Sequence, residues 1–342
     1  MRHMRIYILA AILPAVILSG LFCYLVFGVT IRPAGSGSQV IYLPEESTFE
    51  QVMDSLKTNL RIDNLKVLQW VAEKKNYRSH IKPGRYVIEK GMSCNELINN
   101  LRSGKQTPVL VTFSNIKTIY DLAGRVGGKI EADSARIVTF LSDTENYRSD
   151  GFVRENIISV FLPDTYEFFW NTGPGEFYSR MLREYKKFWN AERIRKADEK
   201  KLTPLEVSVL ASIVDQETSM PDEKPVIAGV YLNRLKRGIP LQADPTIKFV
   251  INDPKMSRIL RRHLSINSPY NTYKYKGLPP GPISCPAKDG IEAVLNADNH
   301  DYLYFVARSD FSGYHVFSRT LSEHNRYAAM YRKELNRRKI FR

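Results

Sequence analysis

One carboxylate at the end of a predicted helix is the best-placed candidate for chemistry in this sequence. Residues 204–217 begin like a helix, with an N-cap threonine, a proline in the first turn and a glutamate that completes a capping box. Apolar residues at helical spacing then predict one buried face: Val209, Leu210, Ile213 and Val214. At about 100° per residue, Glu217 continues this face, whereas Asp215 points away and its replacement should cost little.

Partial burial would give Glu217 the properties of an acid–base catalyst. A carboxyl group at the end of a buried face is partly desolvated and lies at the negative end of the helix dipole, and both effects raise its pKa. A carboxyl group that keeps its proton near neutrality can act as a general acid. The alternative is a structural glutamate paired with a nearby arginine, and helix geometry alone leaves both interpretations open.

An uncharged, mostly apolar run of 26 residues occupies positions 6–31, and crossing a bilayer needs about 20. The basic residues Arg2 and Arg5 precede the run and predict a cytoplasmic N-terminus, with the rest of the chain outside. A cleaved signal peptide would have a shorter apolar core and a small-x-small site, which the end of this run fits poorly. We therefore expect a cytoplasmic tail at 1–5, a transmembrane signal anchor at 6–31 and a linker at 32–38.

The net charge of +14 predicts a polyanionic neighbour. No nucleic-acid recognition motif is present and the chain is predicted to be exported, which favours anionic lipid headgroups or an acidic cell-wall polymer over nucleic acid.

Only Cys94 and Cys285 lie outside the anchor, too few for a disulfide framework or a metal cluster, and both should be free and packed. His315 and His324 lack a third ligand at a suitable spacing, so we expect neither a metal nor another cofactor.

About 310 residues follow the anchor, and this length predicts two domains of mixed α+β class. The first module, at 39–113, combines predicted strands and helices in a small α+β unit. The strands are at 40–43, 84–88 and 109–113, and the helices at 47–60, 65–75 and 94–101. Its spacing of Gly84, Gly91, Leu97, Leu101 and Gly104 resembles the LysM-like modules of some bacterial cell-wall enzymes, so it either binds glycan or acts as a spacer. A helical connector at 114–150 leads to a larger mixed α+β catalytic domain at 151–342.

Six motifs follow one another in order through the larger domain. They comprise residues 162–168, 211–218, 233–235, 241–246, 268–283, and 302–306 with His315, Phe317 and 323–325. In this order the motifs resemble the YceG-like, or MltG-type, family of endolytic murein transglycosylases, and with the anchor and first module the resemblance covers essentially the whole chain. Asp215 and Gln216 stand where relatives often carry Glu-Lys, and Cys285 where relatives often have a small or polar residue. Neither departure affects Glu217, which matches the catalytic glutamate of the family.

The resemblance implies a single-pass enzyme of the bacterial inner membrane that acts on peptidoglycan glycan strands outside the cytoplasm. Such an enzyme cleaves the β-1,4 bond between N-acetylmuramic acid and N-acetylglucosamine, leaves 1,6-anhydro ends, and would trim or terminate nascent strands. Cell-wall synthesis proteins are candidate partners. Two alternatives remain: a muramidase-type hydrolase, which needs a second carboxylate, and a non-catalytic wall-binding anchor.

The motifs also contain candidate substrate contacts: Asn233, Arg234, Gln242, Asp244, Tyr270, Asn271, Thr272 and Tyr273. Arg234 lies late in a helix predicted at 223–237 and could hold a substrate carboxylate or pair with an acid. Asp244 is the only second carboxylate by motif position, although an aspartate before proline is also ordinary turn chemistry. Residues 270–273 combine aromatic faces with amide and hydroxyl groups, as sugar rings require, but such residues are also common in loops.

Overall fold

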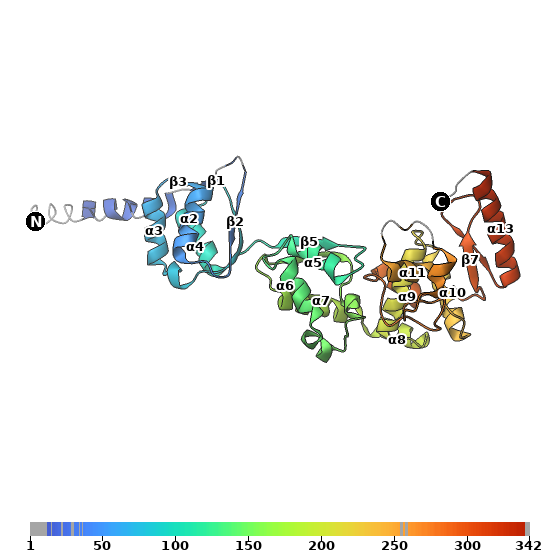
Figure 1. The fold of residues 1–342 in the computed structure, drawn as a ribbon. Helices are drawn as coiled ribbons and strands as arrows, with labels where there is room; N and C mark the ends of the chain where they lie inside the picture. Colours follow the sequence, from blue (N-terminus) through green and yellow to red (C-terminus); the bar gives the residue numbers. More distant parts are fainter. Residues whose placement is uncertain are drawn as a thin grey trace, which may run out of the picture. The chain divides into compact units, whose positions relative to one another are not determined.

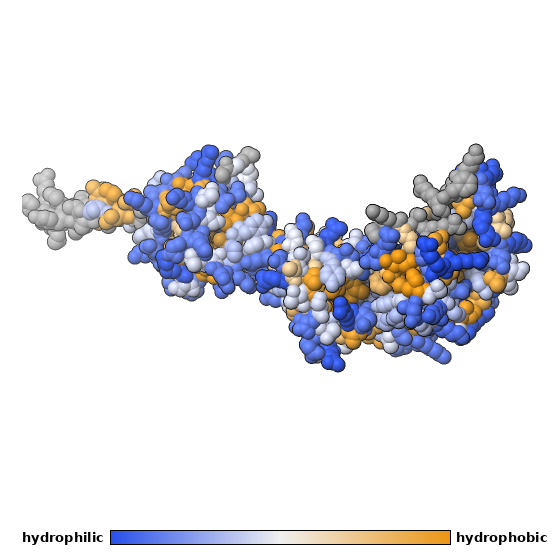
Figure 2. All heavy atoms as spheres, in the orientation of Figure 1, coloured by the Kyte–Doolittle hydropathy of each residue, from blue (hydrophilic) through white to orange (hydrophobic). Residues whose placement is uncertain are grey.

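The computed structural model describes most of the chain: residues 12–14, 16–21, 23–28, 31–33, 35, 37–253, 256 and 259–338. The predicted cytoplasmic tail at 1–5 lies outside the described residues, as do positions 6–11 of the predicted anchor. Those anchor positions that are described form a mostly hydrophobic stretch near the N-terminus (Figure 2) and include the π-helix η1 (Tyr24–Gly28). Within the described part, no helix combines the length and apolarity that a membrane crossing requires.

The chain divides into two compact units, which we describe separately. The N-terminal unit comprises the described residues of Met1–Val111 together with Lys129–Ala132 and Glu167–Gly173, and the C-terminal unit comprises the remainder. The described residues form helices and small two-stranded sheets (Figure 1), which is an α+β architecture, as predicted. Strands β5 (Val109–Phe113) and β6 (Asp164–Phe168) pair with each other.

Among the described residues from Ile31 onward, two antiparallel strand pairs and three α-helices build the N-terminal unit. Strand β1 (Ile31–Pro33) pairs with β3 (Leu60–Ile62), and β2 (Gln39–Leu43) pairs with β4 (Gly84–Ile88). The helices are α2 (Phe49–Asn59), α3 (Leu65–Lys74) and α4 (Cys94–Ser103), with a short 3-10 turn η2 (Tyr77–Ser79). These elements confirm the predicted strands and helices of the first module and add β1 and β3.

Local sequence signals account for the helix ends in this unit. The side chains of Thr48, Asn64 and Ser93 accept hydrogen bonds from backbone N–H groups in the first turns of α2, α3 and α4. Helix α4 ends at Gly104, whose φ of 75° is a left-handed conformation that glycine adopts without a Cβ penalty. The helices bury their apolar faces in one core, in which Leu56, Leu68 and Leu97 are fully buried.

The C-terminal unit is mainly helical and ends in a β-hairpin and a long helix. Its helices are α5 (Ile119–Gly127), α6 (Ser134–Ser142), α7 (Pro174–Phe188), α8 (Ala191–Glu199), α9 (Pro204–Glu217), α10 (Lys224–Lys236), α11 (Asp244–Ile251), α12 (Lys288–Leu295) and α13 (Leu321–Arg337). Short 3-10 turns are η3 (Thr144–Asn146), η4 (Arg148–Asp150), η5 (Ile157–Val160) and η6 (Arg261–Ser265). Strands β7 (Tyr304–Ala307) and β8 (His315–Ser318) form the antiparallel hairpin, with Phe305 opposite Phe317.

Helix α9 lies in the centre of this unit, packed against α10, α11 and α12. It begins as the sequence predicts: Thr203 and Glu206 exchange the two hydrogen bonds of a capping box. All residues from 207 to 214 are buried, so the helix is covered on more than one side. Two serines inside it, Ser208 and Ser212, satisfy their hydroxyls by donating back to helix carbonyls.

Asp215 points away from the Glu217 cavity, as predicted, but it is not a free surface residue. That its replacement costs little activity stays a prediction. Asp215 does not line the cavity that contains Glu217, but its side chain is only 9% exposed. Its carboxylate accepts hydrogen bonds from Lys224 Nζ at 2.7 Å and from the backbone N–H of Ala287 at 2.9 Å. Helical periodicity predicted correctly that the Asp215 side chain points away from Glu217. It could not show that Lys224 and the backbone of Ala287 lie on that side.

The two described cysteines outside the predicted anchor, Cys94 and Cys285, are free and buried, as predicted. Burial raises the pKa of the Cys94 thiol to about 11, so it is an unreactive packing residue.

Candidate active site

Glu217 ends helix α9 at a cavity of about 390 Å³ in the C-terminal unit. The cavity receives side chains from α9, α10, α11, α13, strand β7 and two loops. Its lining residues are Glu217, Tyr231, Arg234, Leu241, Gln242, Asp244, Tyr273, Tyr304, Phe305, Leu321 and His324. The combination of carboxyl, phenol and guanidinium groups in one concave site is typical of a ligand-binding or catalytic centre.

A tyrosine hydroxyl holds the carboxyl group of Glu217. Tyr231 in helix α10 donates a hydrogen bond from its Oη to Glu217 Oε1 at 2.5 Å. The Tyr231 side chain is buried, and its ring meets Phe305 edge to face at a centroid distance of 5.9 Å. Burial raises the pKa of the Tyr231 phenol well above its ordinary value, so the hydroxyl remains a proton donor to Glu217.

Burial also raises the pKa of Glu217, to about 7. The negative charge of Asp244 acts in the same direction, while the hydrogen bond from Tyr231 and the charge of Lys248 oppose it. The raised pKa predicted from the helix face is thus confirmed, with desolvation as its main cause. A carboxyl group with a pKa of about 7 can hold or release a proton near neutral pH.

Removing the tyrosine hydroxyl should raise the Glu217 pKa further. The hydrogen bond from Tyr231 stabilises the carboxylate form, so Tyr231→Phe should move the titration of Glu217 to higher pH. The carbon-13 NMR signal of the labelled glutamate carboxyl, assigned with Glu217→Gln, measures this shift. Tyr302→Phe, which changes a tyrosine outside the cavity, serves as control. An unchanged or lowered titration midpoint in Tyr231→Phe would contradict the hydrogen-bonding scheme.

A second carboxyl group in the cavity has a different environment. Asp244 begins helix α11 and is exposed, and Tyr273 Oη donates to its Oδ1 at 2.5 Å. Burial and the neighbouring Asp244 raise the pKa of Tyr273, which therefore also remains a donor. The cavity thus contains two carboxyl–tyrosine pairs, one with a buried carboxyl and one with a solvated carboxyl. Such a difference in environment separates the acid–base properties of two carboxyl groups.

Arg234 stabilises one wall of the cavity through hydrogen bonds to backbone carbonyls. Its side chain is buried, with Nε donating to the carbonyl of Leu303 at 2.6 Å and Nη1 donating to the carbonyls of Pro240 and Leu241 at 3.0 and 2.8 Å. Nη1 also reaches Gln242 Oε1 at 3.2 Å. Among the described residues it forms no ion pair with an acid, so the structure does not show the second of the two alternatives for Arg234, a pair with an acid. The guanidinium instead fixes the segment that leads to Asp244.

Gln242 has a left-handed backbone conformation with a φ of 53°, which is unfavourable for a residue other than glycine. Two hydrogen bonds hold it there: its backbone N–H donates to the carbonyl of Thr272 at 3.0 Å, and its side chain accepts from Arg234. Strained backbone that is held by its surroundings is common at functional sites. Its side chain is directed to the cavity wall next to Asp244.

Four of the predicted contact residues lie outside this cavity. Asn271 and Thr272 are buried, and their side chains bond to the protein itself. The amide of Asn271 donates to the carbonyls of Leu264 and Ile266, while Thr272 Oγ1 accepts from the backbone N–H of Ala243 at 3.0 Å. Tyr270 packs against Phe249 with ring centroids 4.8 Å apart. These three residues shape the loop that presents Tyr273.

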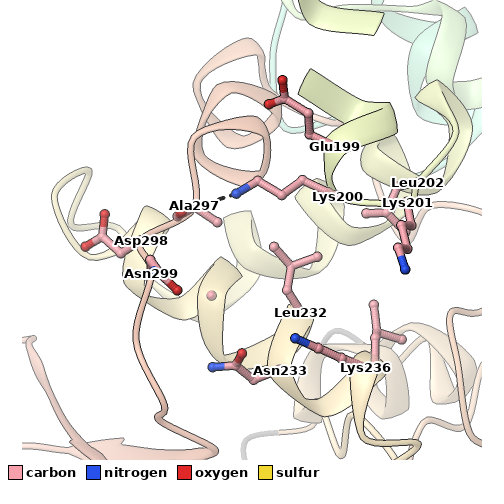
Figure 3. A pocket seen from close by; sticks show the side chains of 12 residues that line it. Glu199, Lys200, Lys201, Leu202, Leu232, Asn233, Lys236, Ala297, Asp298 and Asn299 are labelled. Atoms are coloured by element: carbon pink, nitrogen blue, oxygen red, sulfur yellow. Dashed lines mark hydrogen bonds between the residues drawn. The ribbon is translucent and has the colours of Figure 1, made fainter. Parts of the chain in front are cut away.

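The fourth, Asn233, lies on another face of α10 and lines a separate cavity of about 550 Å³ (Figure 3). Its amide donates to the carbonyls of His300 and Tyr302, at 2.7 and 3.1 Å. Lys200 and Lys201, which follow α8, and Lys236 of α10 line this larger cavity, which does not include Glu217. Asn233 therefore holds the segment before β7 in place and does not reach the Glu217 site.

Sequence reasoning missed Tyr231, Tyr304 and Phe305 as cavity residues. Tyr231 lies three residues before Arg234 on the same helix, and residues three apart share a face. This spacing could have identified it, whereas the two β7 residues reach the cavity through tertiary packing alone. His324 also lines the cavity, and burial lowers its pKa, so its ring is neutral near pH 7.

The other motif histidine, His315, anchors the hairpin to the helices. Its backbone N–H and Nδ1 contact Glu223 Oε1 and Oε2 at 2.6 and 2.8 Å, and Thr218 Oγ1 donates to the same carboxylate at 3.3 Å. Glu223 is buried, so it receives these partners in place of water. This contact joins strand β8 to the residue that follows Glu217, and no metal is needed to explain it.

Comparisons with known proteins show the family of this chain. The model for the YceG-like family matches residues 41–330. The endolytic murein transglycosylase of Bacillus subtilis (strain 168) is 28% identical over 307 residues, covering 85% of this chain and 84% of that protein. The enzyme of the same name from Streptococcus pneumoniae serotype 2 is 27% identical over 340 residues, covering 89% of this chain. This chain spans 61% of the length of that streptococcal protein.

A solved structure shares the fold. A YceG-like protein from Listeria monocytogenes superposes with a TM-score of 0.57 at 24% sequence identity, covering 85% of this chain and 99% of the other.

Proposed function

Because the chain belongs to the YceG-like family, we propose that it is an endolytic peptidoglycan lytic transglycosylase with Glu217 as its catalytic acid and base. The observation that carries this proposal is a carboxyl group with a pKa of about 7, held by a tyrosine hydroxyl in a cavity. Two relatives named endolytic murein transglycosylase support the substrate class.

One carboxyl group is sufficient for this reaction. Protonated Glu217 donates its proton to the glycosidic oxygen between N-acetylmuramic acid and N-acetylglucosamine as the bond from that oxygen to C1 breaks. The resulting carboxylate, held by Tyr231, then accepts the proton of the C6 hydroxyl of the same muramic acid, and O6 bonds to C1. Glu217 is protonated again at the end of the cycle, and the product has a 1,6-anhydro end. A pKa near the working pH suits both proton transfers.

The remaining cavity residues would bind the sugars around this bond. In our proposal Asp244, Tyr273 and Gln242 contact the substrate, and Arg234 holds the wall that carries two of them. For Asn233, Tyr270, Asn271 and Thr272, the geometry favours a role in positioning loops over direct contact within this cavity.

One observation favours a second candidate, a muramidase-type hydrolase. Asp244 lines the same cavity and its charge influences Glu217, so it could position a water molecule on the other side of the bond. Mass spectrometry of peptidoglycan digested by the full-length chain in detergent separates the candidates. Anhydro ends support the transglycosylase and reducing ends the hydrolase, while intact strands would leave only a wall-binding role.

The pH dependence of turnover should reflect Glu217. The free enzyme is active only when this carboxyl group is protonated, so kcat/KM should be highest below pH 7 and fall about tenfold per pH unit well above it. Initial rates on solubilised glycan strands between pH 5 and 9 measure this profile. A kcat/KM that rises through pH 7 would show that Glu217 acts first as a base.

Residues 6–31 would form a single-pass signal anchor that places the units outside the cytoplasm at the bacterial inner membrane. Several described side chains in this run are large, apolar and exposed, including Leu13, Ile17 and Phe27 at 60% or more. A reporter fused after Arg342 should then be active outside the cytoplasm, and protease added to spheroplasts should degrade the units. A protease-resistant chain with a cytoplasmic reporter would contradict both the location and the access to peptidoglycan.

The module at 39–113 would bind glycan in the manner of LysM-like modules, with 114–150 connecting it to the catalytic domain at 151–342. Its paired strands β2 and β4 and helices α2 and α3 support this comparison. Chemical-shift changes within 39–111 of the full chain on adding peptidoglycan oligosaccharides would support the role. Changes confined to the Glu217 cavity would favour a spacer.

A further inference from the structure

A third hollow, of about 500 Å³, lies on the loop that also supplies Tyr273 to the Glu217 cavity. Its lining residues, which we call the Tyr275 shelf, are Asn267, Ser268, Pro269, Tyr275, Leu278 and Pro280. None of them lines the Glu217 cavity, and none was among the residues predicted to contact substrate. The volume is in the range of small-ligand sites.

The ring of Tyr275 is exposed but fixed in orientation. Its side chain is 42% exposed, while its hydroxyl donates to Asn267 Oδ1 at 2.5 Å. Lys274 Nζ donates to the same oxygen at 2.9 Å and lies 5.6 Å from the centroid of the ring. Two donors therefore hold the side chain of Asn267, and Asn267 in turn holds the tyrosine. An aromatic ring held by its edge offers a face to a ligand at little further entropic cost.

The backbone around the shelf is also restrained. The buried amide of Asn271 ties the loop to the carbonyls of Leu264 and Ile266, and prolines restrict φ at positions 269, 279 and 280. Tyr273 and Tyr275 are two residues apart, so their Cα atoms are separated by at most about 7 Å. A single extended ligand could therefore contact both the Glu217 cavity and the shelf.

The chemistry of the shelf fits an uncharged sugar ring. A pyranose has a C–H face that packs on an aromatic ring and a rim of hydroxyls that needs hydrogen-bonding partners. Tyr275, Leu278 and the prolines provide the apolar surface. The exposed amide of Asn267 and the hydroxyl of Ser268 provide polar groups at its edge.

We propose that the Tyr275 shelf is a distal glycan subsite that stacks a sugar of the same strand that is cleaved at Glu217. The inference rests on the proposed function, because it identifies where a strand continues beyond the reacting bond. Contact at a distance from this bond would favour cleavage within long strands over cleavage of short fragments.

The test compares Tyr275→Ala with wild type on long, peptide-free glycan strands and on a short fragment with one cleavable bond. For long strands we expect a roughly tenfold lower kcat/KM, mainly through KM, from the loss of one aromatic stacking contact. The ratio of kcat/KM on long strands to that on the short fragment should therefore fall, and Tyr275→Trp should restore it. Tyr120→Ala, at another exposed tyrosine of this unit, is the matched control.

Binding separates this proposal from the proposed function. In the Glu217→Gln background, Tyr275→Ala should weaken binding of peptide-free strands about tenfold and leave binding of free stem peptide unchanged. This readout needs no turnover, so a shelf that binds strands would still be detected if the chain cleaved none. An equal loss of kcat/KM on long and short substrates, or a loss of stem-peptide binding alone, would overturn the subsite.

Discussion

Replacing Glu217 with glutamine is expected to reduce turnover of glycan strands by about 10²–10⁴-fold or more, because the amide retains the shape of the side chain but cannot donate or accept the transferred proton. Affinity for intact strands should change little, since the cavity and its other polar groups remain. Rates are measured on solubilised strands, and binding by calorimetry with the same preparation. Gln216→Ala, at the exposed neighbouring residue, should retain wild-type rates.

The same variant carries a test of stability. The pKa of Glu217 is raised from 4.5 to about 7, so the folded state binds this proton more tightly than the unfolded state does. The stabilisation is complete below about pH 4.5 and is lost as pH rises through 7. Glu217→Gln should therefore be more stable than wild type at pH 8, by about 1–3 kcal/mol, with little difference at pH 4. A destabilised variant at pH 8 would show that the carboxylate is structural.

Replacing Lys224 with methionine should lower the free energy of unfolding by about 3–5 kcal/mol. Lys224 Nζ lies between Asp215 Oδ1 at 2.7 Å and Asp289 Oδ2 at 2.8 Å, and its side chain is 11% exposed. Burial already raises the pKa of Asp215 despite this lysine, so removing the cation leaves a buried carboxylate without its partner. Chemical denaturation at neutral pH measures the loss.

The matched control is Lys288→Met, which breaks the more exposed pair between Lys288 and Asp164. Pairs of that kind contribute about 0–1 kcal/mol. Asp215→Asn should be destabilising too, but less than Lys224→Met, because Lys224 keeps Asp289. If Lys224→Met cost no more than Lys288→Met, the network between α9, α10 and α12 would not support the end of α9.

Local signals in the sequence predicted the helices well because their causes are local. The capping box of Thr203 and Glu206 set the start of α9, and helical periodicity placed Glu217 on a packed side with a raised pKa. By contrast, strands β1 and β3 have only three residues each, too few for an alternating pattern. Their pairing arises from contacts between distant parts of the chain.

The candidate site was predictable only where a single element determines it. Periodicity identified the direction of Asp215 but could not show that Lys224 and the backbone of Ala287 lie there. The bond between Tyr231 and Glu217 depends on how two helices cross, which no spacing within one helix reveals. Of the motif 270–273, Tyr273 lines the cavity, whereas the other three side chains turn to the protein, because a loop without regular structure must satisfy its own polar groups.

Digestion of peptidoglycan in water labelled with oxygen-18 tests the central claim most directly. If Glu217 acts as sole acid and base, the C6 hydroxyl closes onto C1, and the new ends should be anhydro sugars without the label. Mass spectrometry of the released fragments distinguishes the outcomes, with Glu217→Gln as the blank. Reducing ends that carry oxygen-18 at C1 would show that water attacks the sugar, and would contradict the transglycosylase mechanism in favour of hydrolysis assisted by Asp244.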